Sequence, residues 1–135
     1  MVVSDIMTRD VISVDITATV ADVVALMHDN DFRHVPVLSD GELVGMISDR
    51  DLRGYTMPVL DLNSGEVKRR NLQVPVTDVM NTDTMSLGPE APLSEIIEMM
   101  LEQKVGAVPV LDDHSDKLLG IVSYVDVLIA ARDVL

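Results

Sequence analysis

Apolar residues recur at intervals of three and four positions in two separate stretches of this chain. Such spacing lines the side chains up along one face of an α-helix, so each stretch predicts an amphipathic helix. The two sets are Val20, Val23, Val24 and Met27, and Leu93, Ile96, Ile97 and Met100. Thr19, three residues before Asp22, is suited to cap the first helix, and Pro92 suits the first turn of the second.

Two short β-branched runs follow each of these helices. In the first half of the chain the runs flank Ser39-Asp40-Gly41-Glu42, whose turn-forming residues predict a hairpin. In the second half they flank a longer loop. The predicted strands are 11–14, 35–38, 43–47, 85–87, 108–111 and 118–122, with further helices over 49 to about 53 and 124 to about 133. The order is strand, helix, strand, strand, helix, twice, which predicts a mixed α+β fold.

The chain contains an internal repeat. Val35-Pro36-Val37-Leu38 returns 73 residues later as Val108-Pro109-Val110-Leu111, and after a two-residue insertion Asp51 aligns with Asp126. We expect repeat 1 over residues 1–53, a connection over 54–74 and repeat 2 over 75–135. One copy of this size has too little core to be stable alone, so the two copies are expected to pack as a pseudo-twofold pair.

Composition narrows the classes of function. The 135 residues are 47% hydrophobic, which excludes disorder, and carry 23 acidic against 10 basic side chains, a net charge of −13. An acidic chain repels polyanions, which argues against nucleic acid and anionic membranes as partners. No apolar run reaches the roughly 18 residues of a membrane span. The chain has no cysteine, which excludes disulfides and thiolate metal sites, and we expect a cytoplasmic location.

A glycine, a serine and an aspartate recur together in both repeats. Ser48 lies where a predicted helix begins, and free N–H groups at such a terminus favour a phosphate beside the hydroxyl. Asp51, one turn later, can accept both hydrogen bonds of a ribose diol. The alternative is helix capping, because a serine followed three residues later by an acid is also a capping arrangement. The sets are Gly45, Ser48 and Asp51, and Gly120, Ser123 and Asp126.

These residues resemble a known family, the cystathionine-β-synthase (CBS) domain, over nearly the whole chain outside the connection. The motifs that carry the resemblance are Asp5-Ile6-Met7-Thr8, Val35-Pro36-Val37 and Gly45-Met46-Ile47-Ser48-Asp49-Arg50-Asp51-Leu52, with Asp78-Val79-Met80, Val108-Pro109-Val110 and Gly120-Ile121-Val122-Ser123-Tyr124-Val125-Asp126-Val127 in the second copy. The resemblance implies a tandem pair, the Bateman module, in which two β-α-β-β-α units pack with pseudo-twofold symmetry and commonly dimerise. Such modules usually act as regulatory sensors of adenosine-containing ligands.

The resemblance also implies two ligand clefts, each combining residues of both repeats. One cleft uses Ile121, Ser123 and Asp126 with Phe32 and Arg33, and the other uses Met46, Ser48 and Asp51 with Val105 and Gly106. Arg33 and Arg50 are candidate phosphate partners, whereas the matching positions in repeat 2, Gly106 and Val125, carry no charge. We therefore expect unequal pockets.

Two further features of the sequence each allow a functional and a structural interpretation. Six of the ten basic residues lie between positions 33 and 70, which suits either a local positive field or an ordinary solvated connection that includes Lys68-Arg69-Arg70. The nine methionines include equivalent pairs, Met7 with Met80 and Met27 with Met100, for which core filling is the expected role.

These observations together lead to the hypothesis of a non-catalytic regulatory module with a role in energy sensing. It binds AMP, ADP or ATP, the last with Mg²⁺, requires no cofactor, and signals by a conformational change to an effector protein that the sequence does not name. We expect a homodimer, no catalytic residue and no metal site, since the three histidines lack metal-ligand spacing and Asp112–Asp116 lacks the pattern of a calcium loop. Two alternatives remain: an assembly module without a nucleotide, and a sensor of S-adenosylmethionine.

Overall fold

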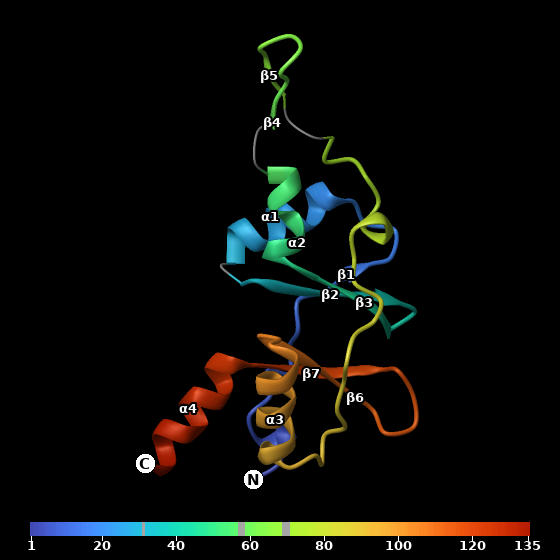
Figure 1. Cartoon of the computed structure of the whole chain (residues 1–135). Helices are drawn as coiled ribbons and strands as arrows, with labels where there is room; N and C mark the ends of the chain where they lie inside the picture. The colour runs from blue at the N-terminus through green and yellow to red at the C-terminus, as the bar shows by residue number, and fades with distance from the viewer. Residues whose placement is uncertain (31, 57–58, 69–70) are drawn as a thin grey trace. The chain divides into compact units, whose positions relative to one another are not determined.

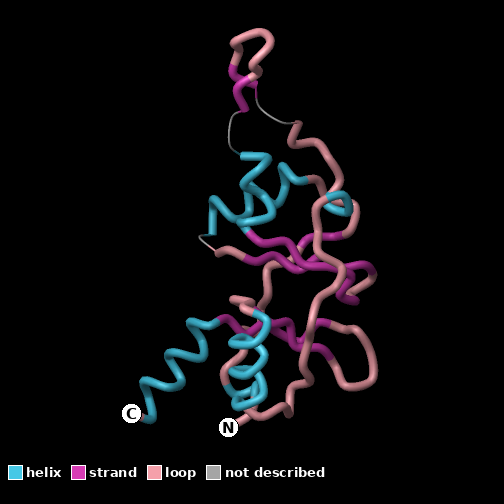
Figure 2. Tube along the Cα trace, viewed as in Figure 1, coloured by secondary structure: helices cyan, strands magenta, loops and turns pink. Residues whose placement is uncertain are grey.

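A computed structural model describes residues 1–30, 32–56, 59–68 and 71–135 of the chain (Figure 1). Most strands and helices lie where the sequence pattern predicts them (Figure 2). The strand predicted over 11–14 is an exception, because it is a two-residue strand at Val14–Asp15. The elements are η1 (Val3–Asp5), β1 (Val14–Asp15), α1 (Val20–Asn30), β2 (His34–Ser39), β3 (Glu42–Ser48), α2 (Asp49–Thr56), β4 (Val59–Leu60), β5 (Val67–Lys68), η2 (Val76–Asp78), α3 (Leu93–Gln103), β6 (Ala107–Leu111), β7 (Leu118–Ser123) and α4 (Tyr124–Val134).

The chain divides into two compact units that do not coincide with the two repeats. Unit 1 contains Met1–Ile12, Asp40–Leu43 and Thr84–Leu135, and unit 2 contains Ser13–Ser39 and Val44–Asp83. The first dozen residues of repeat 1 thus belong to the compact unit formed mainly by repeat 2. Conversely, the start of repeat 2, up to Asp83, belongs to the unit formed mainly by repeat 1.

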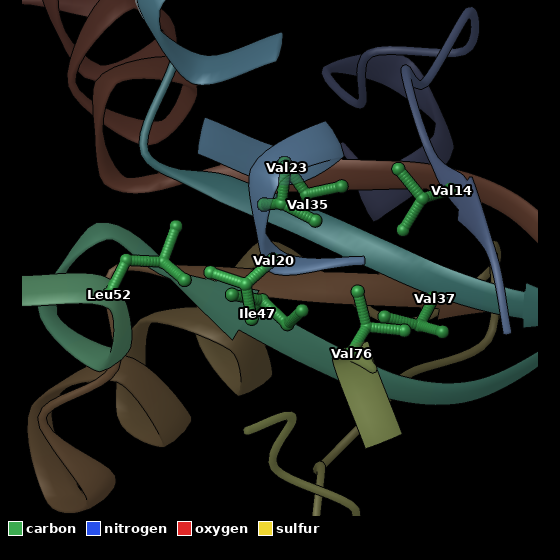
Figure 3. Packing of buried hydrophobic residues seen from close by; sticks show 8 residues of the cluster. All are labelled: Val14, Val20, Val23, Val35, Val37, Ile47, Leu52 and Val76. Carbon is green, nitrogen blue, oxygen red and sulfur yellow. The ribbon is translucent and has the colours of Figure 1, made fainter. Parts of the chain in front are cut away.

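Unit 2 is built on a three-stranded sheet of order β1-β2-β3, in which β1 pairs with β2 in parallel. The helices α1 and α2 contact each other, and α1 also packs on β2. Figure 3 shows the apolar core that results. Its members come from all five elements and from η2: Val14, Val20, Val23, Val35, Val37, Ile47, Leu52 and Val76.

Unit 1 repeats this arrangement around the antiparallel pair β6-β7, with α3 packed on β6 and α4 packed on β7. The expected strand at 85–87 is reduced to a single parallel bridge between Leu87 and Val110. The core residues are Val3, Met7, Leu87, Ile96, Val108, Val110 and Val122. Val3 is fully buried here, so η1 contributes a side chain to the core of this unit.

Local chemistry explains the boundaries. Asp40 and Gly41 have φ angles of 52° and 80°, so the hairpin turn between β2 and β3 is a tight two-residue turn of the type that suits twisted strands. Thr19 caps α1 as expected, because Asp22 N–H donates to Thr19 Oγ1 at 3.3 Å. Pro92 lies one position earlier than expected, as the N-cap of α3 rather than in its first turn.

Three features were not expected from the pattern. Short 3-10 helices, η1 and η2, open the two repeats. The connection contains an antiparallel pair, β4 with β5. The helix α2 continues to Thr56, three residues beyond the expected end. In the described part of the chain, none of the helices has both the length and the apolar character needed to cross a bilayer.

Candidate functional site

The serine and aspartate of repeat 1 form a reciprocal pair at the junction of β3 and α2. Ser48 N–H donates to Asp51 Oδ2 at 2.9 Å, and Asp51 N–H donates to Ser48 Oγ at 3.3 Å. The helix begins here because each side chain satisfies a backbone N–H that the helix itself leaves without a partner. Ser48 is half-buried and Asp51 is exposed, so both polar groups remain within reach of solvent.

The equivalent pair in repeat 2 has the same geometry at the junction of β7 and α4. Ser123 N–H donates to Asp126 Oδ2 at 2.8 Å, and Asp126 N–H donates to Ser123 Oγ at 3.3 Å. One bond is added, because the Ser123 hydroxyl also lies 3.1 Å from Asp126 Oδ2. Both residues are half-buried, so this second pair is less exposed than the first.

A third pair of this kind shows that capping is part of how the protein builds helices. At the start of α1, Thr19 N–H donates to Asp22 Oδ2 at 2.9 Å, although neither residue belongs to a predicted site. The capping interpretation of Ser48 and Asp51 is therefore confirmed. It does not exclude a ligand, because the bonds given above use Oδ2 of Asp51 and leave Oδ1 without a described protein partner.

In each unit, the segment before the Val-Pro-Val strand lies against the start of the helix that carries the serine and aspartate. Asp49 N–H donates to the carbonyl oxygen of Arg33 at 2.9 Å in unit 2. Tyr124 N–H donates to the carbonyl oxygen of Gly106 at 3.0 Å in unit 1. Thus Phe32 and Arg33 lie beside the serine and aspartate of their own repeat, at the start of α2. Val105 and Gly106 lie in the same way beside the start of α4. The cross-repeat pairing implied by the resemblance stays a prediction.

Met46 and Ile121, two of the apolar residues of the predicted sites, are held by backbone hydrogen bonds that the sequence did not reveal. Met46 exchanges two backbone hydrogen bonds with Asn81, at 3.0 and 2.8 Å. Ile121 exchanges two with Thr8, at 3.0 and 2.9 Å. Thr8 and Asn81 occupy equivalent positions directly after the repeated Asp-x-Met motif. Their equivalent positions in the two repeats are the feature of the sequence from which their place beside the two predicted sites could have been inferred.

Each glycine of the motif is needed because a methionine side chain packs directly against its backbone. A Cβ on Gly45 would lie 2.7 Å from Sδ of Met80, and one on Gly120 would lie 2.7 Å from Sδ of Met7. The space beside each glycine is therefore occupied by a methionine of the protein itself. Met7 is buried in the core of unit 1 and Met80 packs against that of unit 2, as expected of core-filling methionines.

The charged residues of the two repeats differ as the sequence predicts. Arg33 and Arg50 are exposed in unit 2, whereas their counterparts in unit 1 are Gly106, which has no side chain, and the exposed Val125. Of the basic run in the connection, residues 69 and 70 lie outside the described residues. Among the described residues, no group of three or more His, Cys, Asp or Glu side chains is placed to hold a metal ion.

His34, at the start of β2, is a half-buried histidine beside the site. Burial lowers the pKa of His34 below its ordinary value of 6.5. The carboxylates of Asp49 and Asp51 act in the opposite direction, and the Arg33 guanidinium adds to the lowering of the pKa. The loss of hydration on burial outweighs the nearby carboxylates, so the folded protein favours the neutral imidazole.

This lowered pKa predicts a pH dependence of stability. Because the unfolded chain binds the proton more tightly than the folded one, the free energy of unfolding is highest above pH 6.5 and falls as the pH drops through the folded pKa. Urea unfolding at a series of pH values measures the effect. His34→Gln should flatten the slope, whereas His114→Gln, in an exposed loop, should leave it unchanged. An unaltered slope in His34→Gln contradicts the assignment.

Comparisons with known proteins agree with this geometry. The family model of the CBS domain matches the chain twice, over residues 3–58 and 76–133. Protein MJ1225 of Methanocaldococcus jannaschii is 34% identical over 130 residues, which are 94% of this chain and 46% of MJ1225. The CBS domain-containing protein YhcV of Bacillus subtilis is 29% identical over 127 residues, which are 94% of this chain and 83% of YhcV. The chain thus spans about half the length of MJ1225 and most of YhcV.

Solved structures give the same result at the level of the fold. The crystal structure of CBSX2 in complex with AMP matches with a TM-score of 0.80 at 28% identity, over 98% of this chain and 97% of that one. The crystal structure of MJ1225 matches with a TM-score of 0.81 at 30% identity, over 96% of this chain and 47% of that one. The mixed fold and the tandem pair expected from the sequence are confirmed.

Proposed function

Because this chain belongs to the CBS domain family and carries the paired repeats of a regulatory module, we propose that it senses an adenosine-containing ligand of the AMP, ADP or ATP class. Binding shifts the balance between two arrangements of the repeats, and an effector protein responds to the shift. Such coupling requires that the ligand bind the two arrangements with different affinity. Proteins of this kind are in general regulatory rather than catalytic, and we infer no catalytic residue in this chain.

The observation that carries the proposal is the duplicated hydrogen-bond pattern at Ser48 and Asp51 and at Ser123 and Asp126. In both places a helix N-terminus, a hydroxyl and a carboxylate stand together at the end of a strand. The N–H groups and hydroxyl suit a phosphate, and the free carboxylate oxygen suits a ribose diol. The AMP in the structure of CBSX2 is a ligand of that protein, and it supports AMP as the first ligand to test.

Each residue has a proposed role. The serines take the phosphate side, the aspartates hold the ribose, and Arg33 and Arg50 supply charge to the phosphate. The adenine is enclosed by backbone and apolar side chains of two groups of residues: Met46, Val105 and Gly106 in one site, and Ile121 and Phe32 in the other.

Calorimetry tests the proposal directly. The purified chain is titrated with AMP, ADP, ATP with Mg²⁺, and S-adenosylmethionine, and its thermal unfolding is followed with each compound. An adenine nucleotide should bind and raise the melting temperature, because a ligand that binds only the folded state stabilises it. Binding of S-adenosylmethionine alone would favour the alternative sensor. A melting temperature unmoved by all four would favour an assembly module in which the serines and aspartates only cap helices.

The unequal charge of the two sites predicts unequal phosphate contacts. Arg50→Ala should weaken the affinity of one site for ATP by about tenfold to 100-fold, because a charged hydrogen bond to phosphate contributes about 1.5–3 kcal/mol. The matched control is Val125→Ala, the equivalent position of repeat 2, which should leave nucleotide affinity unchanged. Two-site calorimetry measures both constants, and an equal loss in the two variants would contradict the prediction.

The same titrations test the cross-repeat pairing. If the pairing implied by the resemblance holds, Arg33→Ala weakens the site that Asp126→Ala removes. If each site is instead completed by its own repeat, Arg33→Ala weakens the site that Asp51→Ala removes. A homodimer, a cytoplasmic location and a separate effector remain parts of the proposal.

A further inference from the structure

A pocket in unit 2 lies beside two residues of the proposed ligand site. It has a volume of about 470 Å³ and is formed by α1, α2 and the segment before β2. We call it the α1–α2 pocket; the two helices that border it lie side by side in Figure 1. Its lining includes Phe32 and Arg33, which are proposed to contact adenine and phosphate. Its volume is within the roughly 300–1,000 Å³ of small-molecule sites. A ligand held at Phe32 and Arg33 therefore has room to extend into the pocket.

The charged groups of the α1–α2 pocket are mainly basic. Arg33, Arg53 and His28 line it, and among the described residues of the lining Asp49 alone carries a carboxylate. Both arginines are exposed to solvent. In the part of the chain that the structure describes, neither arginine has a carboxylate within salt-bridge distance. Their guanidinium groups are therefore available to an anion from solution.

The remaining wall of the pocket strengthens the effect of these charges. It is apolar and is formed by Val24, Met27 and Leu52, the last of which is buried in the core of unit 2. An apolar wall concentrates the field of nearby cations, because it screens charge much less than water does. Arginine, moreover, presents a planar set of N–H donors that matches the oxygens of a phosphate. The pocket thus suits phosphate groups placed between the two arginines.

Repeat 2 has no basic residue at any of the three equivalent positions. The residues equivalent to Arg33, His28 and Arg53 are Gly106, Leu101 and Leu128. Leu101 is 72% exposed and Leu128 is 62% exposed, so these positions offer apolar side chains in place of cations. A chain of two or three phosphates would therefore find cations in unit 2 that unit 1 does not supply.

We propose that the site containing Phe32 and Arg33 prefers a nucleoside diphosphate or triphosphate to the monophosphate, because the terminal phosphates enter the α1–α2 pocket and contact Arg53. This inference rests on the proposed function and names the ligand class of one of its two sites. The first phosphate binds at Arg33, and the terminal phosphates lie between Arg53 and His28. Arg53 thereby determines specificity for the length of the phosphate chain. The other site, with Leu128 at the matching position of its repeat, has no such preference.

Calorimetry with AMP, ADP and ATP in a buffer free of divalent cations tests the proposal, because Mg²⁺ would otherwise neutralise part of the phosphate charge. In the unaltered chain, one binding step should tighten from AMP to ATP by about tenfold to 100-fold, the effect of one charged hydrogen bond. Arg53→Leu should lose this gain for ATP and change the affinity for AMP much less. Arg53→Lys, which keeps the charge, should retain most of the gain. Arg33→Ala should weaken the same binding step.

Two variants control for net charge and for position. Arg132→Leu also removes one positive charge, but from α4, where Arg132 is paired with Asp133 at 3.5 Å. Leu128→Ala alters the position of repeat 2 that is equivalent to Arg53. Neither variant should change the ratio of ATP affinity to AMP affinity. The proposal is overturned if AMP binds at least as tightly as ATP at both sites, or if Arg132→Leu lowers the ratio as much as Arg53→Leu does.

Inorganic tripolyphosphate separates this inference from the proposed function, because it carries the charges of the ATP tail without the adenosine. It should bind the unaltered chain and bind Arg53→Leu about tenfold more weakly. A chain that binds AMP and ATP equally, and tripolyphosphate no better than Arg53→Leu does, overturns the pocket proposal alone. A chain that binds tripolyphosphate through Arg53 but binds no adenosine compound overturns the adenosine ligand alone.

Discussion

Replacing both Asp51 and Asp126 by alanine is expected to abolish the binding of adenine nucleotide. Each carboxylate is proposed to accept two hydrogen bonds from a ribose, worth about 3 kcal/mol together, so each replacement should weaken its site by about 100-fold. Calorimetry with AMP measures the loss. The single variants should each remove one binding step, and the double variant should remove both.

Capping provides the matched control for this experiment. Asp22 accepts the N–H of Thr19 at 2.9 Å, just as Asp51 accepts that of Ser48 at 2.9 Å, yet Asp22 lies outside the proposed sites. Asp22→Ala should therefore lose about 1 kcal/mol of stability, as any capping loss does, and keep full nucleotide affinity. Undiminished binding in the Asp51 and Asp126 double variant would overturn the assignment of the sites.

Gly120→Ala is expected to be among the most destabilising single changes in the chain. The added Cβ would lie 2.8 Å from the carbonyl oxygen of Thr8 and 2.7 Å from Sδ of Met7. The oxygen belongs to backbone that exchanges two hydrogen bonds with Ile121, so it cannot move without breaking them. Overpacking of this kind costs about 1–3 kcal/mol, and we expect the upper end of that range. Urea denaturation measures the loss.

Gly45→Ala is the internal comparison, because the same site in repeat 1 is less constrained. There the nearest backbone atom is the carbonyl oxygen of Asn81 at 3.2 Å, and the closest contact is with the flexible side chain of Met80. A cost of about 1 kcal/mol is expected, and Met80→Ala should relieve part of it. Met7→Ala should relieve less of the cost of Gly120→Ala, because the contact with the carbonyl oxygen of Thr8 at 2.8 Å remains. Equal costs at the two glycines would contradict the role given to Thr8.

Much of the fold follows from short-range patterns. The apolar stripe from Val20 to Met27 is sufficient to predict α1, because helical periodicity does not depend on what the helix packs against. The turn at Asp40 and Gly41 is likewise local, since both residues adopt positive φ angles with little cost. The capping of α1 by Thr19 was predictable for the same reason.

The candidate sites were predictable in their chemistry but not in their surroundings. Ser48 and Asp51 were identifiable because the same residue types recur as Ser123 and Asp126 in a second copy. Thr8 and Asn81 were missed because each hydrogen-bonds to a residue far away in the sequence. Thr8 bonds to Ile121 and Asn81 bonds to Met46, and in both cases the two residues belong to different repeats. No local pattern states which distant strand such a segment will meet.

The sequence by itself determined the two repeats, most of their helices and strands, and the residue types of the proposed site. Only the tertiary structure decided that Val3 is buried with repeat 2 and Val76 with repeat 1, and that the face with Leu101 remains exposed. The physical reason is that the apolar character of a side chain indicates that it avoids water. It does not indicate which surface the side chain packs against. That partner is selected by long-range packing, where shape and backbone hydrogen bonds choose among many apolar surfaces of similar composition.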